Sequence, residues 1–538
     1  MSINQRADDK TGKAPEVGGR YAHYVLFVLI LVYIFNFVDR NILSILAEDI
    51  KADLGISDAQ MGFLYGTVFA VFYAVFGIPL ARFADVWNRR SLISLGLLIW
   101  SGMTVLSGTA KSFFGLATYR VGVGIGEASA SPAAYSILAD YYPPQIRAFV
   151  IALYSSGVYI GGGLGLAVGG WVVDAWATAY PESPPLGLKG WQVAFFVVGA
   201  PGILLAAWVR SLREPIRGMS EGLVTKPHPA PWKVLYEELV SVLPGLSFAY
   251  LARVQAGVLR NLTSLVLVGL GVYLLAALTG SIGQWVVLGI GVYITLTWAQ
   301  LLKKRDAATY HMLFGSKALI YSVLAFPTIS FVSYGVGFWV APYLLREFGA
   351  SPGDIGFYIG LGNAVAGLMG VSIGGYLADR WKLKYANGRL YVVFIGVGLT
   401  IPSVLMMLYT DSIAVALWMN FVYHIPITMF VGIPPATTSD LVVPRMRAVA
   451  GAFYLLMNTL IGLALGPYFI GQMSDLFAEA GRDGADALRL AMLSALGIFA
   501  LTIVFVLLAM RHLPRDEATR LERAKALGED FVKASEDR

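Results

Sequence analysis

The sequence predicts an all-α integral membrane protein built from two six-helix bundles, with 12 core transmembrane helices related by pseudo-two-fold symmetry. The chain of 538 residues is 57% hydrophobic and only 14% charged, whereas soluble domains carry about 25% charged residues. Its long apolar stretches fall into two sets of six, and a spanning helix needs roughly 20 such residues. Loop motifs recur between the two sets, which favours two repeated bundles over one irregular bundle.

The first bundle is expected over residues 22–210, after a polar tail at residues 1–21. Its first apolar stretch is long and carries Asp39 and Arg40, so we interpret it as a retained helix and not a cleaved signal peptide. The six predicted spans are 22–46, 59–81, 91–109, 113–138, 148–173 and 191–209.

The second bundle is expected over residues 316–510, followed by a charged tail at residues 511–538 that we expect to be a solvated helix. Its predicted spans are 316–344, 354–378, 389–409, 412–436, 448–473 and 488–510.

Residues 211–315 form the predicted linker between the bundles, and this linker contains two further apolar runs. Residues 262–279 and 284–302 are separated by a short Gly-containing segment, which predicts an accessory transmembrane hairpin at about 262–303. The alternative is helices that lie along the membrane surface, as residues 234–258 with their interspersed charges could do.

Loop charges predict the orientation of the chain. Basic loops alternate with acidic ones, and the positive-inside rule places the basic loops, both termini and the linker in the cytoplasm. We therefore expect a multi-pass protein of a bacterial inner membrane. The basic loops contain Arg82, Arg89, Arg90, Arg147, Arg380, Lys382, Lys384, Arg445 and Arg447.

Composition also excludes several classes of function. The chain has no cysteine, so disulfides and thiolate chemistry are excluded. The sequence has no Walker motif, and its glycines at 122, 124 and 126 sit inside an apolar helix with no preceding strand. We expect no enzyme activity, no cofactor, no metal and no nucleic-acid partner, and a monomer in contact with membrane lipids.

Two pairs of loop motifs reveal the internal repeat. The segment from Asp140 to Ala148 matches that from Asp440 to Ala448, with Asp, Pro, Arg and Ala at one constant offset. Residues 81–90, which include Asp85, match Gly375 to Arg380. Gly161 and Gly165 recur as Gly462 and Gly466, shifted by one position.

These motifs resemble the major facilitator superfamily, whose loop signature between spans two and three is best kept from Gly375 to Arg380 and then at Gly388-Arg389. In the first copy Ala81, Val86 and Asn88 depart from it. More narrowly, Asp39-Arg40-Asn41 and the segment from Arg120 to Ala128 resemble the Spinster family of lipid transporters. The resemblance implies alternating access, and in animal relatives the export of sphingosine-1-phosphate-like lipids or lysophospholipids.

Charges at bilayer depth are costly unless they are paired or hydrated, and the first bundle holds Asp39, Arg40, Arg120 and Glu127. Arg120 and Glu127 are two helical turns apart and share a face. We expect Glu127 or Asp39 to accept a proton, because a low dielectric disfavours a carboxylate. Arg40 or Arg120 would then hold an anionic headgroup. The alternative is a fixed ion-pair network between spans one and four.

The second bundle offers mostly aromatic and neutral candidates for the substrate site, which suits an amphipathic substrate with its tail toward this half. Aromatic residues in spans are more often packing residues, and a histidine beside a proline is more often a hydrogen-bonded helix residue. The candidates are Tyr334, Phe338, Trp339, His424 and Asn458.

Charged loop residues are candidates for a conformational gate. Asp85 and Asp379 are expected at cytoplasmic helix ends, one loop away from Arg147 and Arg447. Such pairs, with Arg89 and Arg380 beside the acids, could latch the halves in one state, since a few kcal/mol of bias suffices.

The sequence therefore predicts a proton-coupled secondary transporter for an amphipathic, lipid-like anion, acting by alternating access. Two alternatives stay open. One is a proton-coupled carrier of small organic anions, and the other is a lipid-sensing membrane protein that does not transport.

Overall fold

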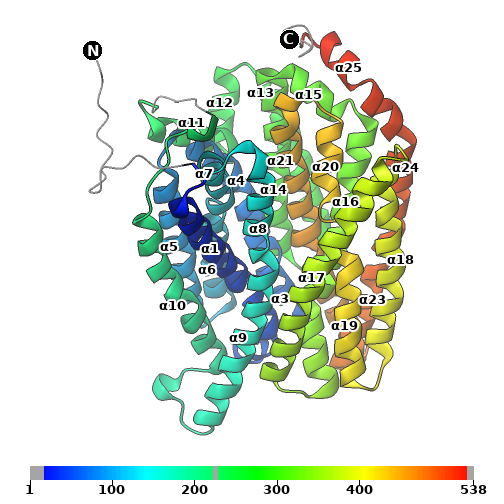
Figure 1. The fold of residues 1–538 in the computed structure, drawn as a ribbon. Helices are drawn as coiled ribbons and strands as arrows, with labels where there is room; N and C mark the ends of the chain where they lie inside the picture. The colour runs from blue at the N-terminus through cyan, green and yellow to red at the C-terminus, as the bar shows by residue number, and fades with distance from the viewer. Residues whose placement is uncertain (1–16, 222–227, 530–538) are drawn as a thin grey trace.

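The computed structural model describes residues 17–221 and 228–529, and every regular element in that part of the chain is a helix (Figure 1). Most of the predicted N-terminal tail therefore lies outside the described residues. The helices of the first half are α1 Arg20–Ile45, α2 Ala47–Leu54, α3 Asp58–Tyr65, α4 Thr67–Val86, α5 Arg89–Ser107, α6 Phe113–Glu127, α7 Ala130–Tyr141, α8 Pro144–Ser155, α9 Gly157–Ala179 and α10 Gly190–Arg210.

The described part of the linker holds five α-helices, and the second half repeats the pattern of the first. The linker helices are α11 Pro231–Val242, α12 Leu246–Arg253, α13 Val258–Thr279, α14 Ile282–Arg305 and α15 Ala307–Phe314. The second half contains α16 Lys317–Phe348, α17 Pro352–Lys382, α18 Gly388–Tyr409, α19 Ile413–Thr428, α20 Ile433–Asp440, α21 Arg447–Met457, the π-helical turn η4 Asn458–Leu463, α22 Ala464–Glu479, α23 Gly484–Leu496, α24 Ile498–Ala518 and α25 Arg520–Ala526.

Thirteen helices of the described chain are long and apolar enough to cross a membrane. The predicted span at 113–138 is not among them, and it is divided at Ala128 and Ser129 into α6 and α7. The Ser129 hydroxyl donates to the carbonyl oxygen of Gly126 at 2.8 Å, and such a local bond competes with helical hydrogen bonding. The other predicted spans coincide with helices that pass the test.

Both ends of the described chain lie toward one face, which we call the terminus face. It carries α11, α12, α15 and α25 at the top of Figure 1, and the loop between α9 and α10 lies at the opposite end, the far face. The two helices α11 and α12 meet at an angle of 102°. They cover the segment for which we considered a position along the membrane surface.

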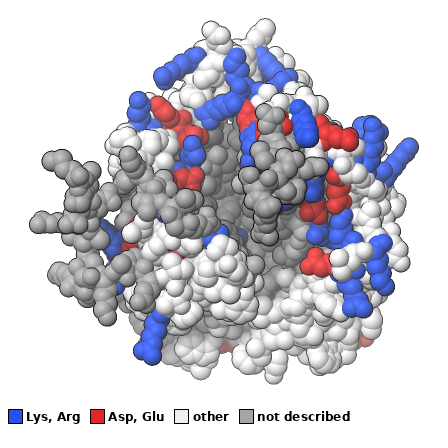
Figure 2. All heavy atoms as spheres, turned by 45° about the horizontal axis from the view of Figure 1, so that its top comes forward, with Lys and Arg blue, Asp and Glu red and all other residues white. Residues whose placement is uncertain are grey.

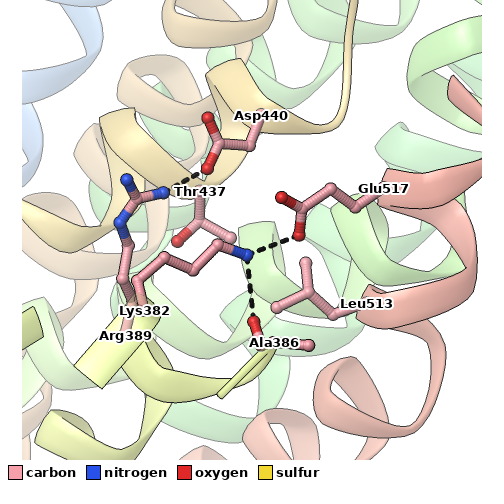
Figure 3. A pocket seen from close by; sticks show the side chains of 7 residues that line it. All are labelled: Lys382, Ala386, Arg389, Thr437, Asp440, Leu513 and Glu517. Carbon is pink, nitrogen blue, oxygen red and sulfur yellow. Dashed lines mark hydrogen bonds and ion pairs between the residues drawn. The ribbon is translucent and has the colours of Figure 1, made fainter. Parts of the chain in front are cut away.

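The internal repeat appears in the structure as two equivalent ion pairs. Arg89 pairs with Asp140 in the first half, and Arg389 pairs with Asp440 in the second (Figure 3). The partners in the second pair are each 300 residues beyond their counterparts. The π-helical turn η4 explains why later positions are shifted by one, because such a turn inserts one extra residue into an α-helix.

The accessory hairpin is formed by α13 and α14, which turn at Gly280 in the left-handed conformation (φ 71°). The helix α13 lies on the outside of the molecule, with none of its most apolar window buried. The helix α14 packs between α13 and the core, against α4 and η4. The structure thus contains a two-helix hairpin between the halves, and its crossing of the membrane stays a prediction.

The C-terminal tail does not stand free in solvent up to residue 529. Glu517 pairs with Lys382 (Figure 3), Asp516 accepts a hydrogen bond from Ser316 Oγ at 2.8 Å, and Arg520 donates to the carbonyl oxygen of Asp440 at 2.8 Å. The segment is helical and many of its residues are exposed, as expected for a solvated helix, but these contacts hold one side of it against the second half.

Candidate functional site

The structure brings the four membrane charges of the first half together. Asp39 and Arg40 lie on α1, and Arg120 and Glu127 lie on α6. Their exposed fractions are 0%, 7%, 1% and 1%. The four side chains thus lie inside the protein, and only Arg40 keeps a small exposed fraction.

One ion pair joins the two helices at this cluster. Arg40 Nη2 donates to Glu127 Oε2 at 2.7 Å. The Arg40 guanidinium also lies over the rings of Phe69 and Phe37, at 4.3 and 4.6 Å from their centroids. Cation–π contacts of this kind stabilise a desolvated guanidinium. Arg40 is therefore stabilised both by its ion pair with Glu127 and by the two aromatic rings.

The other two charges, Asp39 and Arg120, form no direct ion pair in the described part of the chain. Arg120 Nη1 reaches only the backbone carbonyl of Asp39, at 3.4 Å. Among the described residues, neither carboxylate oxygen of Asp39 has a hydrogen-bond partner, and the same holds for Nε and Nη2 of Arg120 and Oε1 of Glu127. Buried polar atoms without partners are costly, so these groups can gain from a proton, a water molecule or an anion.

The candidates of the second half separate into two groups. Tyr334 lies near Arg40, across the interface between the halves. Phe338 stacks on Tyr65 at 4.3 Å between ring centroids, and Trp339 donates to the carbonyl oxygen of Pro467 at 2.8 Å. Phe338 and Trp339 are at most 1% exposed, so Phe338 packs against the first half and Trp339 packs within the second half.

The remaining two candidates lie away from these contacts. Asn458 accepts a hydrogen bond from Ser330 Oγ at 2.6 Å and begins the π-helical turn. His424 lies beside the Tyr423 ring, and its Nδ1 has no partner among the described residues.

The predicted gate residues at the terminus face make contacts within their own regions of the chain. Asp85 lies 3.7 Å from Arg82, and Arg89 binds Asp140 and Glu214. Arg147 donates to Ser220 Oγ at 3.1 Å.

The second-half counterparts behave similarly. Asp379 lies 3.7 Å from Arg389, and Arg380 donates to the Tyr376 hydroxyl at 3.0 Å. Arg447, which begins α21, is exposed. A latch between the halves at this face stays a prediction for another conformational state.

A gate that we did not predict closes the far face. Arg346 of α16 donates to both carboxylate oxygens of Asp58, at 2.6 and 2.9 Å, and to Glu48 at 2.7 Å. Lys51 also pairs with Asp58, and Ser474 donates to it at 2.7 Å. From the sequence alone, the acidic loops of this face serve only as markers of orientation. The signal in the sequence that could have indicated this gate is Arg346, an arginine just after the seventh predicted span.

Two repeat-related aspartates reinforce this gate. Asp475 of α22 accepts hydrogen bonds from the first two backbone amides of α3, at 3.0 and 2.8 Å. Asp174 of α9 accepts one from Gly353 N at the start of α17, at 2.8 Å. A carboxylate at a helix N-terminus satisfies free N–H groups and complements the helix dipole. Each aspartate therefore fastens one half to the other.

Glycines allow the halves to approach closely at the far face. A Cβ at Gly471 would lie 2.3 Å from the carbonyl oxygen of Asp58, and one at Gly170 would lie 2.1 Å from that of Pro352. The terminus face, in contrast, is hollowed near its middle, with charged side chains around the hollow (Figure 2). The protein is therefore closed at the far face.

A second cluster at the terminus face ties the linker and the tail to the second half. Arg445 donates to Asp306 at 2.8 Å and to Glu529 at 2.6 Å. The hydrogen bonds from Arg445 lower the pKa of Asp306 to about 2, and they also lower the pKa of Glu529.

Comparison with known proteins identifies the family. The model of the Major Facilitator Superfamily matches residues 29–341. The chain is 28% identical to an MFS-type efflux pump of Mycolicibacterium smegmatis, over 92% of this chain and 93% of that protein. It is 23% identical to Protein spinster of Drosophila melanogaster, over 85% of this chain and 62% of that protein.

A solved structure agrees with these matches. The crystal structure of a bacterial homolog to the human lysosomal transporter Spinster, inward-facing and unoccupied, has a TM-score of 0.71 and 28% identity. The match covers 92% of this chain and 98% of that one. Together these findings confirm the predicted architecture of 12 core helices and indicate a transporter and not an enzyme. The chain belongs to the major facilitator superfamily of secondary transporters, and within it is similar to the Spinster proteins.

Proposed function

We propose that this protein carries an amphipathic, lipid-like anion across a bacterial inner membrane, with the terminus face toward the cytoplasm, and that proton binding drives the cycle. The cluster of Arg40, Glu127, Asp39 and Arg120 supports this proposal, because it holds two guanidiniums and two carboxyls with one ion pair among them. The closed far face and the hollowed terminus face correspond to the inward-facing stage of alternating access.

Proton transfer to Glu127 is the proposed coupling step. A proton from water binds the Glu127 carboxylate, which neutralises it and weakens its hydrogen bond with Arg40. Arg40 stays charged, and its freed N–H groups then bind the oxygens of an anionic headgroup. When the anion leaves, the uncompensated guanidinium favours loss of the proton from Glu127, and the ion pair forms again.

Asp39 and Arg120 have supporting parts in this proposal. Arg120 has two nitrogens without a hydrogen-bond partner among the described residues, so it is the second candidate for the headgroup. Asp39 has no partner for either oxygen among the described residues, so it is the second candidate for a proton.

The unequal character of the two halves supports an amphipathic substrate. All four buried charges of the cluster belong to the first half, and the candidates of the second half are aromatic or neutral. A small organic anion is the second candidate, because the same guanidiniums would bind a carboxylate. A lipid sensor without transport is the third hypothesis.

Transport assays in proteoliposomes test these alternatives. We expect uptake of an anionic lysophospholipid to depend on a pH gradient, and we expect Glu127→Gln to abolish that dependence. The control Glu479→Gln alters an exposed carboxylate at the far face and should leave transport unchanged. Gradient-driven transport that persists in Glu127→Gln would reject the coupling role, and binding without flux in the wild type would favour a sensor.

A further inference from the structure

The accessory hairpin covers one of two equivalent seams between the halves. By the internal repeat, α4 corresponds to α17, and α21 corresponds to α8. The seam between α4 and α21 with η4 is therefore equivalent to the seam between α17 and α8. The hairpin lies over the first seam only.

The helix α14 contacts both sides of the covered seam along its length. Thr67 of α4 donates to Gln284 at 2.6 Å, and Ser281 donates to Gln472 of α22 at 3.1 Å. Nearer the terminus face, Trp298 stacks on Phe453 of α21 at 5.9 Å between centroids.

The middle of α14 fits into the seam at Gly291. A Cβ at Gly291 would lie 2.8 Å from the Leu460 side chain of η4 and 3.3 Å from that of Val71 in α4. At Gly291, α14 therefore contacts one residue of each half and covers the seam between them.

Exposure at repeat-related positions shows what the hairpin changes. Val71 is 0% exposed and its counterpart Val365, 294 positions later, is 44% exposed. Phe453 is 6% exposed and its counterpart Leu153, 300 positions earlier, is 42% exposed. The same two helix faces are therefore covered on one side of the molecule and open on the other.

At each of the two seams, aromatic side chains connect the helices of the seam to Arg40. On the open side, Tyr154 of α8 stacks on Tyr33 at 4.4 Å, Tyr33 contacts Phe37 at 5.2 Å, and Phe37 faces Arg40. On the covered side, Phe69 of α4 faces Arg40 directly. Figure 1 shows α8 and α17 separating toward the terminus face, above the contact of α9 with α17.

We propose that the hairpin formed by α13 and α14 seals the seam between α4 and α21 against the bilayer. A membrane-borne substrate then reaches Arg40 only through the seam between α8 and α17. The proposed route of the substrate rests on the proposed function, because it assumes a lipid-like substrate. The covering of the seam by the hairpin does not depend on that assumption.

Photolabelling in proteoliposomes tests the seal. A lysophospholipid with a diazirine in its acyl chain is activated by light, and labelled peptides are mapped by mass spectrometry. We expect several-fold more label at Val365 and Leu153 than at Val71 and Phe453. Equal labelling of the two seams in the wild type would overturn the proposal.

Two sets of variants sharpen the test. Gly291→Leu pushes α14 off the seam and should raise labelling at Val71 several-fold, whereas Gly271→Leu, where a Cβ meets nothing within 4 Å, should not. Unchanged labelling in a folded Gly291→Leu protein would show that α14 is not the cover. Leu153→Trp narrows the open seam and should reduce lysophospholipid transport, whereas Leu267→Trp on the outer face of α13 should not.

Transport measured on the same vesicles separates the seal from the function. Unequal labelling without any lysophospholipid flux would leave the seal in place and reject the proposed substrate. Equal labelling with flux would reject the seal and leave the proposed substrate standing.

Discussion

Removing the charge of Asp58 should open the far face. The substitution Asp58→Asn keeps the shape of the side chain and an oxygen that can accept from Ser474, which donates to Asp58 at 2.7 Å. It removes the negative charge that Arg346 and Lys51 share. Arg346 is then left at the interface with Glu48 as its acidic partner.

The size of the effect follows from the hydrogen bonds that are lost. Arg346 makes two charge-assisted hydrogen bonds with Asp58, and bonds to charged groups contribute roughly 1.5–3 kcal/mol each. The side chains of Arg346 and Asp58 are 12% and 6% exposed, so solvent screens them only partly. Taking the lower figure for each bond gives about 3 kcal/mol, or roughly a 100-fold shift toward the far-face-open state.

Distances between spin labels measure this shift directly. The chain has no native cysteine, so Ala52→Cys and Ala480→Cys, both exposed at the far face on opposite halves, can carry the labels. We expect Asp58→Asn to add a population at longer distance. The control Asp486→Asn removes a charge paired within the second half. A distribution unchanged in Asp58→Asn would refute the gate.

Three further predictions concern the same interfaces. Asp475→Asn should weaken the cap on α3 by about 1 kcal/mol and shift the same label distances partway toward the open form; no shift would mean that the cap does not bias the equilibrium. Gly471→Ala should prevent closure at the far face, because its Cβ would meet a backbone carbonyl at 2.3 Å, whereas Gly269→Ala on the hairpin should not; transport and label distances report both. Asp306 has a pKa of about 2 in the folded protein, below its unfolded value of about 3.9, so its contact with Arg445 stabilises the fold above about pH 4 and is lost as the pH falls toward 2. The melting temperature of Asp306→Asn should accordingly lie below that of the wild type near pH 6, and the difference should shrink on acidification.

The charged site illustrates how far sequence reasoning could go. The spacing of Arg120 and Glu127 predicts a shared helix face, and the cost of charge in a bilayer predicts that all four charged residues turn inward. The sequence could not tell which groups would pair. Arg40 pairs with Glu127 because the packing of α1 against α6 brings the two side chains within 2.7 Å. The residue spacing within either helix does not give this distance between helices.

The far-face gate was missed for the same reason. Asp58 and Arg346 are 288 positions apart in the sequence. Acidic residues in loops are also explained by the orientation of the chain in the membrane, so they do not by themselves indicate a gate. The caps by Asp174 and Asp475 also depend on where the helix of one half ends against the other half. Only the packing of the halves shows that these residues meet.

By itself, the sequence determined the membrane class, the two repeated sets of spans, the hairpin and the residues that bear charge at bilayer depth. Apolar length and the cost of buried charge act locally along the chain, so they can be read without coordinates. The tertiary structure alone decided which charges pair, which face is closed and which seam the hairpin covers. These depend on distances between helices that are far apart in the chain, and local preferences do not specify such distances.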